Sequence, residues 1–325
     1  MKRKNCYICE VVGFRSIGSM FIVHALFIVF RYLGIVRWTY VNFMADVNKE
    51  RAIRAIVGSC VESYASGFSD RHISEVNDED GVINMKIHNV FIAALGPEIQ
   101  YYSALARSLD SSLGNMLEKM AIRIATLNYT VSQHVEGVLY KEQTDYIAEI
   151  LEKYKRHAIT PSIEDYEGIT MRRGSVIEKR HESDYYLIDE ETGQHYLIEL
   201  KIGGDLDNKK ARSEKEALLE QYCILTNQLG EENVKILFAT AYNRYGEGKP
   251  WTQGRVLQFF AKDELCISRD FWNLVCKSDD GYDIVIDEYK KNAHLINAAL
   301  DRIKDRKSTR LNSSHVRTSR MPSSA

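Results

Sequence analysis

The feature that most constrains the fold is residues 184–240, where two short strand patterns, a helix pattern and an apolar strand pattern follow one another. The segment DYYLID, Asp184–Asp189, has the apolar and aromatic content of a strand, and the EETG after it is typical of a turn. The segment QHYLIELKIG, Gln194–Gly203, has a similar strand pattern. The two segments are therefore predicted to form a β-hairpin.

A long helix is predicted after the hairpin, beginning at Asn208 or Ser213 and ending at Gly230. Its apolar residues recur at the spacing of one helix face: Leu218, Tyr222, Leu225 and Leu229. The segment VKILFAT, Val234–Thr240, is nearly all apolar, as expected of a central strand covered on both faces. The order strand, strand, helix, strand predicts an α/β fold with a mixed sheet core flanked by helices.

The chain is predicted to be mainly helical before this block and mixed after it. Before it, the patterns predict a helix over Asn48–Ser66, a polar loop over Ser69–Asp80, a β-rich or mixed segment over Gly81–Leu95, a helix from a cap at Ser111 or Ser112 to about Leu127, and a helix over Tyr140–His157. After it, a loop rich in glycine and aromatic residues leads to a strand around VLQFF, Val256–Phe260, and then to two helices.

Both ends of the chain differ in character from the rest. The tail DRKSTRLNSSH, residues 305–315, back-translates into DNA that resembles a sequencing-library adapter, so we expect residues 305–325 not to be native. Residues 1–43 combine a basic start with an uncharged apolar run, whereas Met44 opens a segment typical of a cytosolic start. We expect a wrongly assigned start, with Met44 as the true one; the alternative is a signal peptide or membrane anchor.

Between these ends we expect a mainly helical part over residues 44–160 and an α/β core with C-terminal helices over residues 161–304. The full chain carries a net charge of −2, but residues 44–304 alone carry −11 because both ends are basic. An acidic body of this kind would meet a nucleic acid only through a local basic patch.

The cysteines indicate a reducing compartment. Four of them are scattered among apolar residues of the body: Cys60, Cys223, Cys266 and Cys276. Their spacing fits neither a disulfide framework nor a zinc site. We therefore expect a cytoplasmic protein that has no membrane partner.

Two charged residues stand in the apolar part of the second predicted strand. Residues two apart in a strand share a face, so Glu199 and Lys201 are predicted to point the same way. Asp184 begins the partner strand, with fourteen residues between it and Glu199. Buried unpaired charge is costly, whereas two carboxylates that converge on a divalent cation offset that cost. The pattern favours a metal site beside a lysine; the alternative is an exposed pair at the sheet edge.

These residues resemble the motif of the PD-(D/E)xK nuclease superfamily, which the chain carries as Asp184 and Glu199-Leu200-Lys201. The proline that usually precedes the aspartate is replaced by Ser183. Four further segments, SLGNMLEKMAIRIA, ESDYYLID, LIELKIGGDLDNKKA and FWNLV, resemble the TdeIII-type family of type II restriction endonucleases. The resemblance covers most of residues 44–290 and implies a restriction-endonuclease-like fold.

The resemblance implies a site-specific deoxyribonuclease that defends against foreign DNA. It would hydrolyse double-stranded DNA at a short specific sequence with Mg²⁺, leaving 5′-phosphate and 3′-hydroxyl ends. Asp184, Glu199 and Lys201 would be catalytic. Asp184, Glu199 and the carbonyl of Leu200 would hold the metal.

Two more residues and two partners follow from the same resemblance. Many of these nucleases place an acid on an N-terminal helix, and Glu118, bordered by small residues, is the matching candidate. Gln221, on the helix after the Glu-Leu-Lys strand, is a candidate for orienting the site. A palindromic target would match a homodimer, and a cognate DNA methyltransferase would be the genetic partner.

Basic and polar residues near this motif are candidates for DNA contacts. Residues close to the motif are candidates for phosphate contacts: Lys209, Lys210 and Arg212, and also Arg172, Arg173, Lys179 and Arg180. The loop AYNRYGEGKPWTQGR offers candidates for reading base edges: Arg244, Lys249, Gln253 and Arg255. The alternative for each of them is a solvated charged face.

Two other classes of function are compatible with the same motif. A non-catalytic DNA-binding protein on this scaffold would bind specifically without metal-dependent cleavage. A structure-specific or repair nuclease would cut flaps or single strands instead of a fixed duplex sequence. A neighbouring methyltransferase gene would favour restriction over both, because fold alone does not decide function.

Overall fold

The computed structural model describes residues 46–74, 89–204 and 206–318, without the side chains of Pro97, Asp184 and residues 306–318. The chain divides into a segment that ends at Ala52 and a body that begins at Ile53. The fold below is that of the body. The helix over residues 46–74 crosses the division, and its part from Ile53 onward is called the N-terminal helix. The segment 1–43 and its predicted boundary at Met44 lie outside the described residues.

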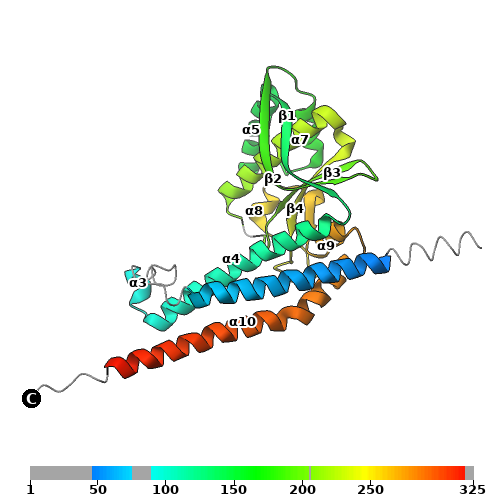
Figure 1. Ribbon diagram of the computed structural model, residues 1–325. Helices are drawn as coiled ribbons and strands as arrows, with labels where there is room; N and C mark the ends of the chain where they lie inside the picture. The colour runs from blue at the N-terminus through cyan, green and yellow to red at the C-terminus, as the bar shows by residue number, and fades with distance from the viewer. Residues whose placement is uncertain (1–45, 75–88, 205, 319–325) are drawn as a thin grey trace, which may run out of the picture. The chain divides into compact units, whose positions relative to one another are not determined.

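A five-stranded sheet stands at the centre of the described body, in the order β1-β2-β3-β4-β5 (Figure 1). The strands are β1 (Thr130–Tyr140), β2 (Val176–Asp189), β3 (Gln194–Leu200), β4 (Val234–Thr240) and β5 (Leu265–Ile267). β2 is antiparallel to both β1 and β3, whereas β4 is parallel to both β3 and β5. The mixed sheet flanked by helices that the sequence predicts is confirmed.

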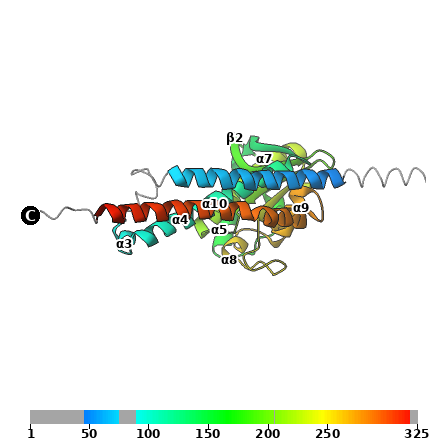
Figure 2. The same cartoon turned by 60° about the horizontal axis from the view of Figure 1, so that its bottom comes forward.

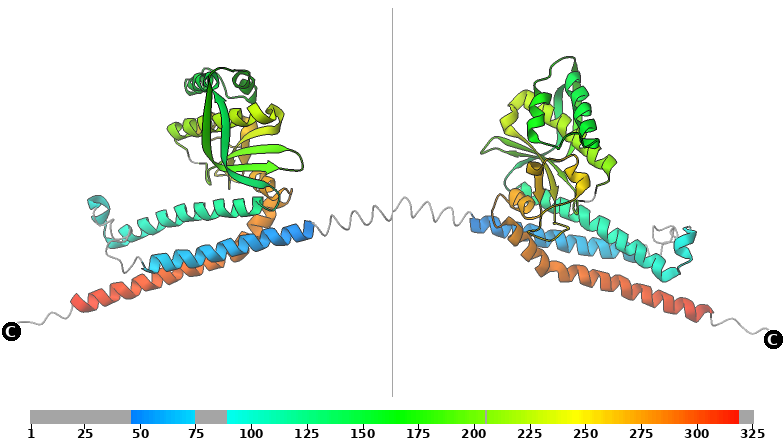
Figure 3. Two further views of the ribbon diagram at one scale, coloured as in Figure 1. Left: turned by 45° about the horizontal axis from the view of Figure 1, so that its top comes forward. Right: turned by 180° about the vertical axis from the view of Figure 1, so that it is seen from behind.

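Helices cover both faces of the sheet, as Figures 1 and 3 show. One face packs against the N-terminal helix, α4 (Pro97–Ala125), α9 (Arg269–Cys276) and α10 (Gly281–Thr318). The other packs against α5 (Lys141–Lys155) and α7 (Asn208–Leu229). These are called the α4 face and the α7 face. β3 contributes to both, because Leu197 packs on the α7 face and Leu200 on the α4 face.

The helical layer on the α4 face is built from three long helices. The N-terminal helix, α4 and α10 share buried apolar residues, among them Val57, Met120 and Ala299. Figure 2 shows α10 running alongside the N-terminal helix. Shorter helices complete the described fold: α3 (Val90–Ala93), η2 (Ile163–Tyr166), α6 (Glu167–Thr170), η3 (Glu231–Asn233), α8 (Gly254–Leu257) and η4 (Lys262–Glu264).

Several predicted boundaries in the helical part are wrong. α4 begins at Pro97, so Ser112 is not a cap but lies inside the helix, where its hydroxyl donates to the Ser108 carbonyl at 2.6 Å. The first predicted helix continues to residue 74, through the start of the predicted polar loop. Residues 75–88 lie outside the described residues, and Val90–Ala93 is helical. α5 and α7, in contrast, are confirmed, and Gly230 caps α7.

The predicted strand around VLQFF is also wrong. Residues Gly254–Leu257 form α8 because the side chain of Gln253 caps them, accepting from the backbone N–H of Arg255 at 2.7 Å. The fifth strand, β5, follows at Leu265. β1 has no counterpart in the prediction, although it lies in the same sheet as the predicted strands.

The described residues also bear on the cysteine and membrane predictions. All four body cysteines are buried: Cys60, Cys223, Cys266 and Cys276. Within the described ranges, no helix combines the length and apolar content that crossing a bilayer requires.

A buried ion pair ties α7 to the segment before β5. Lys215 is fully buried, and its Nζ lies 2.5 Å from Oε1 of Glu264, which is 1% exposed. The hydroxyl of Tyr166 donates to the same carboxylate, and Oε2 of Glu264 accepts from the backbone N–H of Ala261 at 2.7 Å. Burial lowers the pKa of Lys215, although the charge of Glu264 opposes this shift. Each charge is thus compensated inside the core.

Removing one partner of this pair should destabilise the fold strongly. We expect Lys215→Ala to lower the free energy of unfolding by about 3–5 kcal/mol, because it leaves a carboxylate buried without its cation. Urea denaturation measures the change. The exposed Lys262 provides the matched control, since Lys262→Ala should change stability by less than ~0.5 kcal/mol. An equally small effect of Lys215→Ala would contradict this role.

Candidate active site

Glu199 and Lys201 lie together at the end of β3. Glu199 is 6% exposed, although strand alternation turns it to the α7 face between apolar neighbours. The Lys201 ammonium forms an ion pair with Oε1 of Glu199, while the Lys201 side chain is 30% exposed. The predicted shared face is confirmed, and the pair is not an exposed edge pair because β3 lies between β2 and β4.

The backbone around this pair is held from both sides. β3 pairs in parallel with β4, with Glu199 opposite Phe238 and Leu200 opposite Ala239. The backbone N–H of Lys201 donates to the Ala239 carbonyl at 3.0 Å, which extends the pairing past the strand end. A turn follows, closed by Gly204 N–H donating to the Lys201 carbonyl at 2.9 Å. The pair is therefore fixed by the central strands.

The turn after Lys201 requires glycine. Gly204 has φ +64°, in the left-handed region, and a Cβ added there would collide with the ring of Trp251. Trp251 comes from the loop after β4, so the loops that follow β3 and β4 meet beside the candidate site.

Glu214 on α7 is a site residue that the sequence reasoning missed. Its Oε1 lies 3.6 Å from the Nζ of Lys201, so that lysine stands between two carboxylates. The side chains of Lys201 and Glu214 are 30% and 32% exposed, which leaves this side of the site open to solvent. The sequence offered one sign of Glu214: a helix, α7, follows strand β3, and its first turns pass back over the end of that strand.

Asp184 lies in β2, next to β3. The last antiparallel pair between the two strands joins Tyr185 to Ile198. Asp184 precedes Tyr185 and Glu199 follows Ile198, so each lies one position beyond that pair. The side chain of Asp184 lies outside the description. Leu200, the predicted backbone ligand, is 1% exposed, and its side chain packs on the α4 face. Backbone pairing therefore brings Asp184, Glu199 and Leu200 to one end of the paired stretch of β2 and β3.

Gln221 occupies the buried side of α7. It follows Glu214 by seven residues, or two helical turns, so both lie on one side of the helix. Gln221 is 3% exposed, and its Oε1 has no hydrogen-bond partner in the described part of the chain. A buried carboxamide oxygen of this kind is costly unless something binds it. This observation is compatible with a role in holding a polar group of the site.

A charged cluster stands beside Gln221. Oε2 of Glu220 lies 2.9 Å from Nε2 of His181 and 2.5 Å from Nζ of Lys179, both on β2. Burial by itself would raise the pKa of Glu220, but the hydrogen bonds from His181 and Lys179 outweigh it and lower that pKa. Lys179, predicted as a phosphate contact, therefore anchors β2 to α7.

Glu118 lies on the other side of the sheet. The backbone carbonyl of Glu118 accepts a hydrogen bond from the Tyr185 hydroxyl at 2.7 Å. Glu118 and Ser183 both line a hollow of about 540 Å³ on the α4 face. Glu199 faces α7 instead. The structure thus brings Glu118 near the residues that flank Asp184 and does not bring it to the Glu199–Lys201 pair.

The DNA-contacting residues predicted at the start of α7 and around the loop after β4 fall into three groups. Four are exposed: Lys209, Lys210, Lys249 and Arg255. Arg244 is exposed as well and lines an apolar hollow of about 510 Å³ between α4 and α10. Arg212 pairs with Glu152 of α5 at 3.3 Å. Gln253 is 8% exposed and its carbonyl oxygen caps α8, so its predicted role in base reading is not supported.

Oxygen ligands dominate the candidate metal position. Glu199, Glu214 and the Leu200 carbonyl offer hard donors, which suit a divalent ion such as Mg²⁺. Among the described side chains, no group of three or more His, Cys, Asp or Glu residues is arranged to hold a metal ion. The Asp184 carboxylate is outside that set. The donor chemistry fits a hard cation.

Comparison with protein families gives one match. The family model described as "Type II restriction endonuclease, HinfI" matches residues 50–293, which include the whole sheet and the Glu199–Lys201 pair. No curated protein matches the chain. The predicted class of type II restriction endonuclease is therefore confirmed, whereas the narrower likeness to the TdeIII-type family stays a prediction.

The contacts of Glu220 with His181 and Lys179 predict that the free energy of unfolding depends on pH. A carboxyl whose folded pKa lies below its usual 4.5 stabilises the folded state above that pH, and this contribution is lost as the pH falls through the folded pKa. We expect Glu220→Gln to be less stable than wild type near neutral pH, with the difference shrinking below about pH 4.5. Urea denaturation across this range tests it, with the exposed Glu232→Gln as the control. A difference independent of pH would contradict the assignment.

Proposed function

The chain belongs to the HinfI family of type II restriction endonucleases, and we propose that Glu199 and Lys201 form its catalytic centre. One observation carries the proposal. The buried carboxylate of Glu199 and the partly exposed ammonium of Lys201 lie side by side at the end of the central strand β3. The site is open to solvent on the side where Glu214 lies. A fixed carboxylate can hold a divalent cation, and an accessible ammonium can reach a phosphate oxygen.

The arrangement supports a PD-(D/E)xK type of centre. Glu199 and Lys201 come from β3, and Asp184 comes from the adjacent strand at the neighbouring position. β3 is followed by α7 and then by β4, in the order that the sequence pattern predicts. The TdeIII-type likeness would add a subfamily to this assignment and rests on the sequence segments alone.

We propose that a divalent ion, Mg²⁺, is held by the carboxylates of Asp184 and Glu199 and by the Leu200 carbonyl. Such an ion, when bound, supplies positive charge beside the scissile phosphate. Glu214 lies near enough to Lys201 to contribute a further oxygen or to orient the lysine. Gln221, with its buried carboxamide oxygen, would fix a polar group of the site.

Lys201 has two tasks in this proposal. Its ammonium donates a hydrogen bond to the attacking water and another to a phosphate oxygen, so it orients the first and stabilises the charge that develops on the second. Water gives up a proton to the solvent as its oxygen bonds to phosphorus, and the bond from phosphorus to the 3′-oxygen breaks. The 3′-oxygen takes up a proton, which leaves a 5′-phosphate and a 3′-hydroxyl.

The surrounding surface supplies the proposed DNA contacts. Lys209 and Lys210 at the start of α7, and Arg244, Lys249 and Arg255 around the loop after β4, are exposed and basic. Glu118 stays a candidate that would act from the α4 face. A homodimer would match a palindromic target, and a DNA methyltransferase would protect the host's own DNA, consistent with defence against foreign DNA in the cytoplasm.

Replacing Lys201 tests this centre directly. We expect Lys201→Ala to reduce cleavage of unmethylated phage DNA in Mg²⁺ by about 10²- to 10³-fold or more, because a positioned charge is lost from the transition state. Glu199→Gln should have a comparable effect. DNA binding, measured in EDTA by fluorescence anisotropy, should persist in both variants.

The matched control is Lys235→Ala, which removes an exposed lysine from the neighbouring strand β4. It should leave cleavage unchanged. Full activity of Lys201→Ala would refute the assigned centre. Specific binding by wild type without any cleavage would favour the non-catalytic alternative, and preference for flaps or single strands would favour a structure-specific nuclease.

A further inference from the structure

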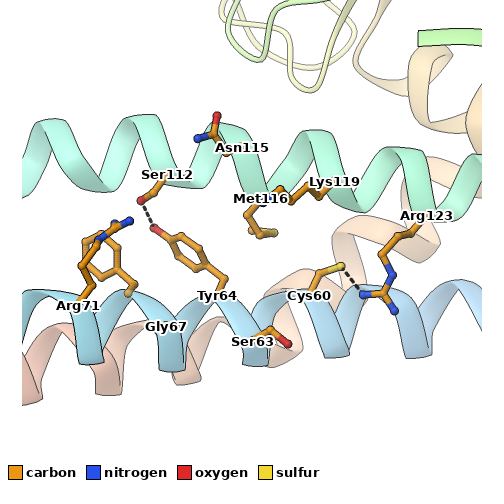
Figure 4. A pocket seen from close by; sticks show the side chains of 11 residues that line it. Cys60, Ser63, Tyr64, Gly67, Arg71, Ser112, Asn115, Met116, Lys119 and Arg123 are labelled. Carbon is orange, nitrogen blue, oxygen red and sulfur yellow. Dashed lines mark hydrogen bonds between the residues drawn. The ribbon is translucent and has the colours of Figure 1, made fainter. Parts of the chain in front are cut away.

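A polar groove runs between the N-terminal helix and α4, away from the Glu199–Lys201 pair. It encloses about 450 Å³. Figure 4 shows Arg71 on the N-terminal helix, and Lys119 and Arg123 on α4, along its length. Neutral polar groups lie among them, including Ser112 and Asn115. This feature is called the basic groove, and none of the described residues that line it is acidic.

The three cations of the basic groove have no carboxylate partners in the described part of the chain. Arg123 donates to the sulfur of Cys60 at 3.1 Å, and the Arg71 guanidinium lies 5.6 Å from the centre of the Phe68 ring. Neither contact neutralises charge. Elsewhere exposed cations pair readily, as Arg269 does with Asp283 at 2.6 Å. In a body with an excess of acidic residues, three unpaired cations in one groove indicate an anionic ligand.

The shape of the basic groove indicates an extended ligand. Its α4 side is a row at helical spacing, from Ser112 through Asn115 and Lys119 to Arg123. At 1.5 Å of rise per residue this row is about 16 Å long. Its floor is stiff, because Tyr64 and Ser112 join the two helices through a hydrogen bond of 3.1 Å. A groove of this length suits several successive phosphates better than one small ion.

The basic groove leads toward the strand that carries Asp184. Two of its residues, Asn115 and Lys119, also line the hollow of about 540 Å³ beside the sheet. That second hollow is bounded by Ser183 and Tyr185, the residues on either side of Asp184, and also by the acidic residues Glu118 and Glu182. The hollow lies on the α4 face, whereas Glu199 and Lys201 face α7, so phosphates in the groove would lie across the sheet from the candidate centre.

We propose that the basic groove binds the phosphate backbone of double-stranded DNA at a distance from the cleavage position. Arg71, Lys119 and Arg123 contact successive phosphates. This inference rests on the proposed nuclease function and adds a second DNA contact on the α4 face. The contact carries no base specificity, so it sets affinity and orientation.

Gly67 offers a test that leaves the packing intact. It lines the groove, and a Cβ added there meets nothing within 4 Å. Gly67→Glu places a negative charge in the groove, one helical turn before Arg71, whereas Gly67→Gln matches its size without charge. Gly67→Lys reverses the sign. All three should fold, because replacing glycine inside a helix removes a destabilising residue.

The measurement is fluorescence anisotropy of a labelled mixed-sequence duplex in EDTA, which prevents cleavage. We expect Gly67→Glu to weaken binding about fivefold, Gly67→Gln to match wild type, and Gly67→Lys to bind more tightly. The double variant Lys119→Gln with Arg123→Gln should lower the slope of log affinity against log salt by about 1.8. The exposed Lys290→Gln on α10 should leave the slope unchanged.

The outcomes separate this inference from the proposed function. Wild-type binding that the Gly67 and Lys119/Arg123 variants leave unchanged would overturn the basic groove as a DNA contact and leave the nuclease intact. Failure of the wild type to bind any duplex would overturn both. A thermal stabilisation by inorganic phosphate that needs Lys119 and Arg123, with DNA affinity unchanged in the variants, would assign the groove to a small anion instead.

Discussion

The carboxylate of Glu199 lies against the ammonium of Lys201 at the end of a strand that is covered on both faces. Burying charge in such a place is costly, and ion pairs in protein interiors can frequently be replaced by apolar side chains without loss of stability. Stability alone therefore does not account for this pair. The sheet holds both residues rigidly, since β3 pairs with β2 on one side and β4 on the other.

A second buried ion pair shows what a purely structural role looks like. Lys215 and Glu264 are both closed off from solvent, and Tyr166 and a backbone N–H satisfy the remaining donors and acceptors. The Glu199–Lys201 pair differs because the Lys201 side chain is partly exposed to solvent. A second carboxylate, that of the partly exposed Glu214, also lies beside Lys201. One pair is sealed within the core, and the other opens to the outside, as a site that receives a substrate must.

The sequence was informative where a pattern was local. The hairpin, α7 and β4 could be predicted because turn residues and helical or strand periodicity lie within the segment itself. β1 could not, since its mixed sequence, TVSQHVEGVLY, becomes a strand only by pairing with a distant partner. α8 was mistaken for a strand because a single capping side chain, Gln253, decides its conformation.

The same limit applies to the candidate site. Spacing alone predicted that Glu199 and Lys201 share a face, because strand alternation fixes it. Glu214 depends on how α7 returns over β3, and the basic groove depends on how two helices pack, so neither is visible in a linear pattern. Glu118 matched a family pattern on a helix, yet that helix covers the face opposite to Glu199.

The central claim is that this chain cuts duplex DNA at a fixed sequence through a metal-supported centre at the end of β3. Its most direct test is incubation of the wild-type protein with unmethylated phage DNA, with Mg²⁺ and with EDTA. The account predicts discrete fragments in Mg²⁺ only, with ends that a ligase can rejoin because they carry 5′-phosphates and 3′-hydroxyls. Intact DNA from a folded protein, or a continuous smear, would contradict it.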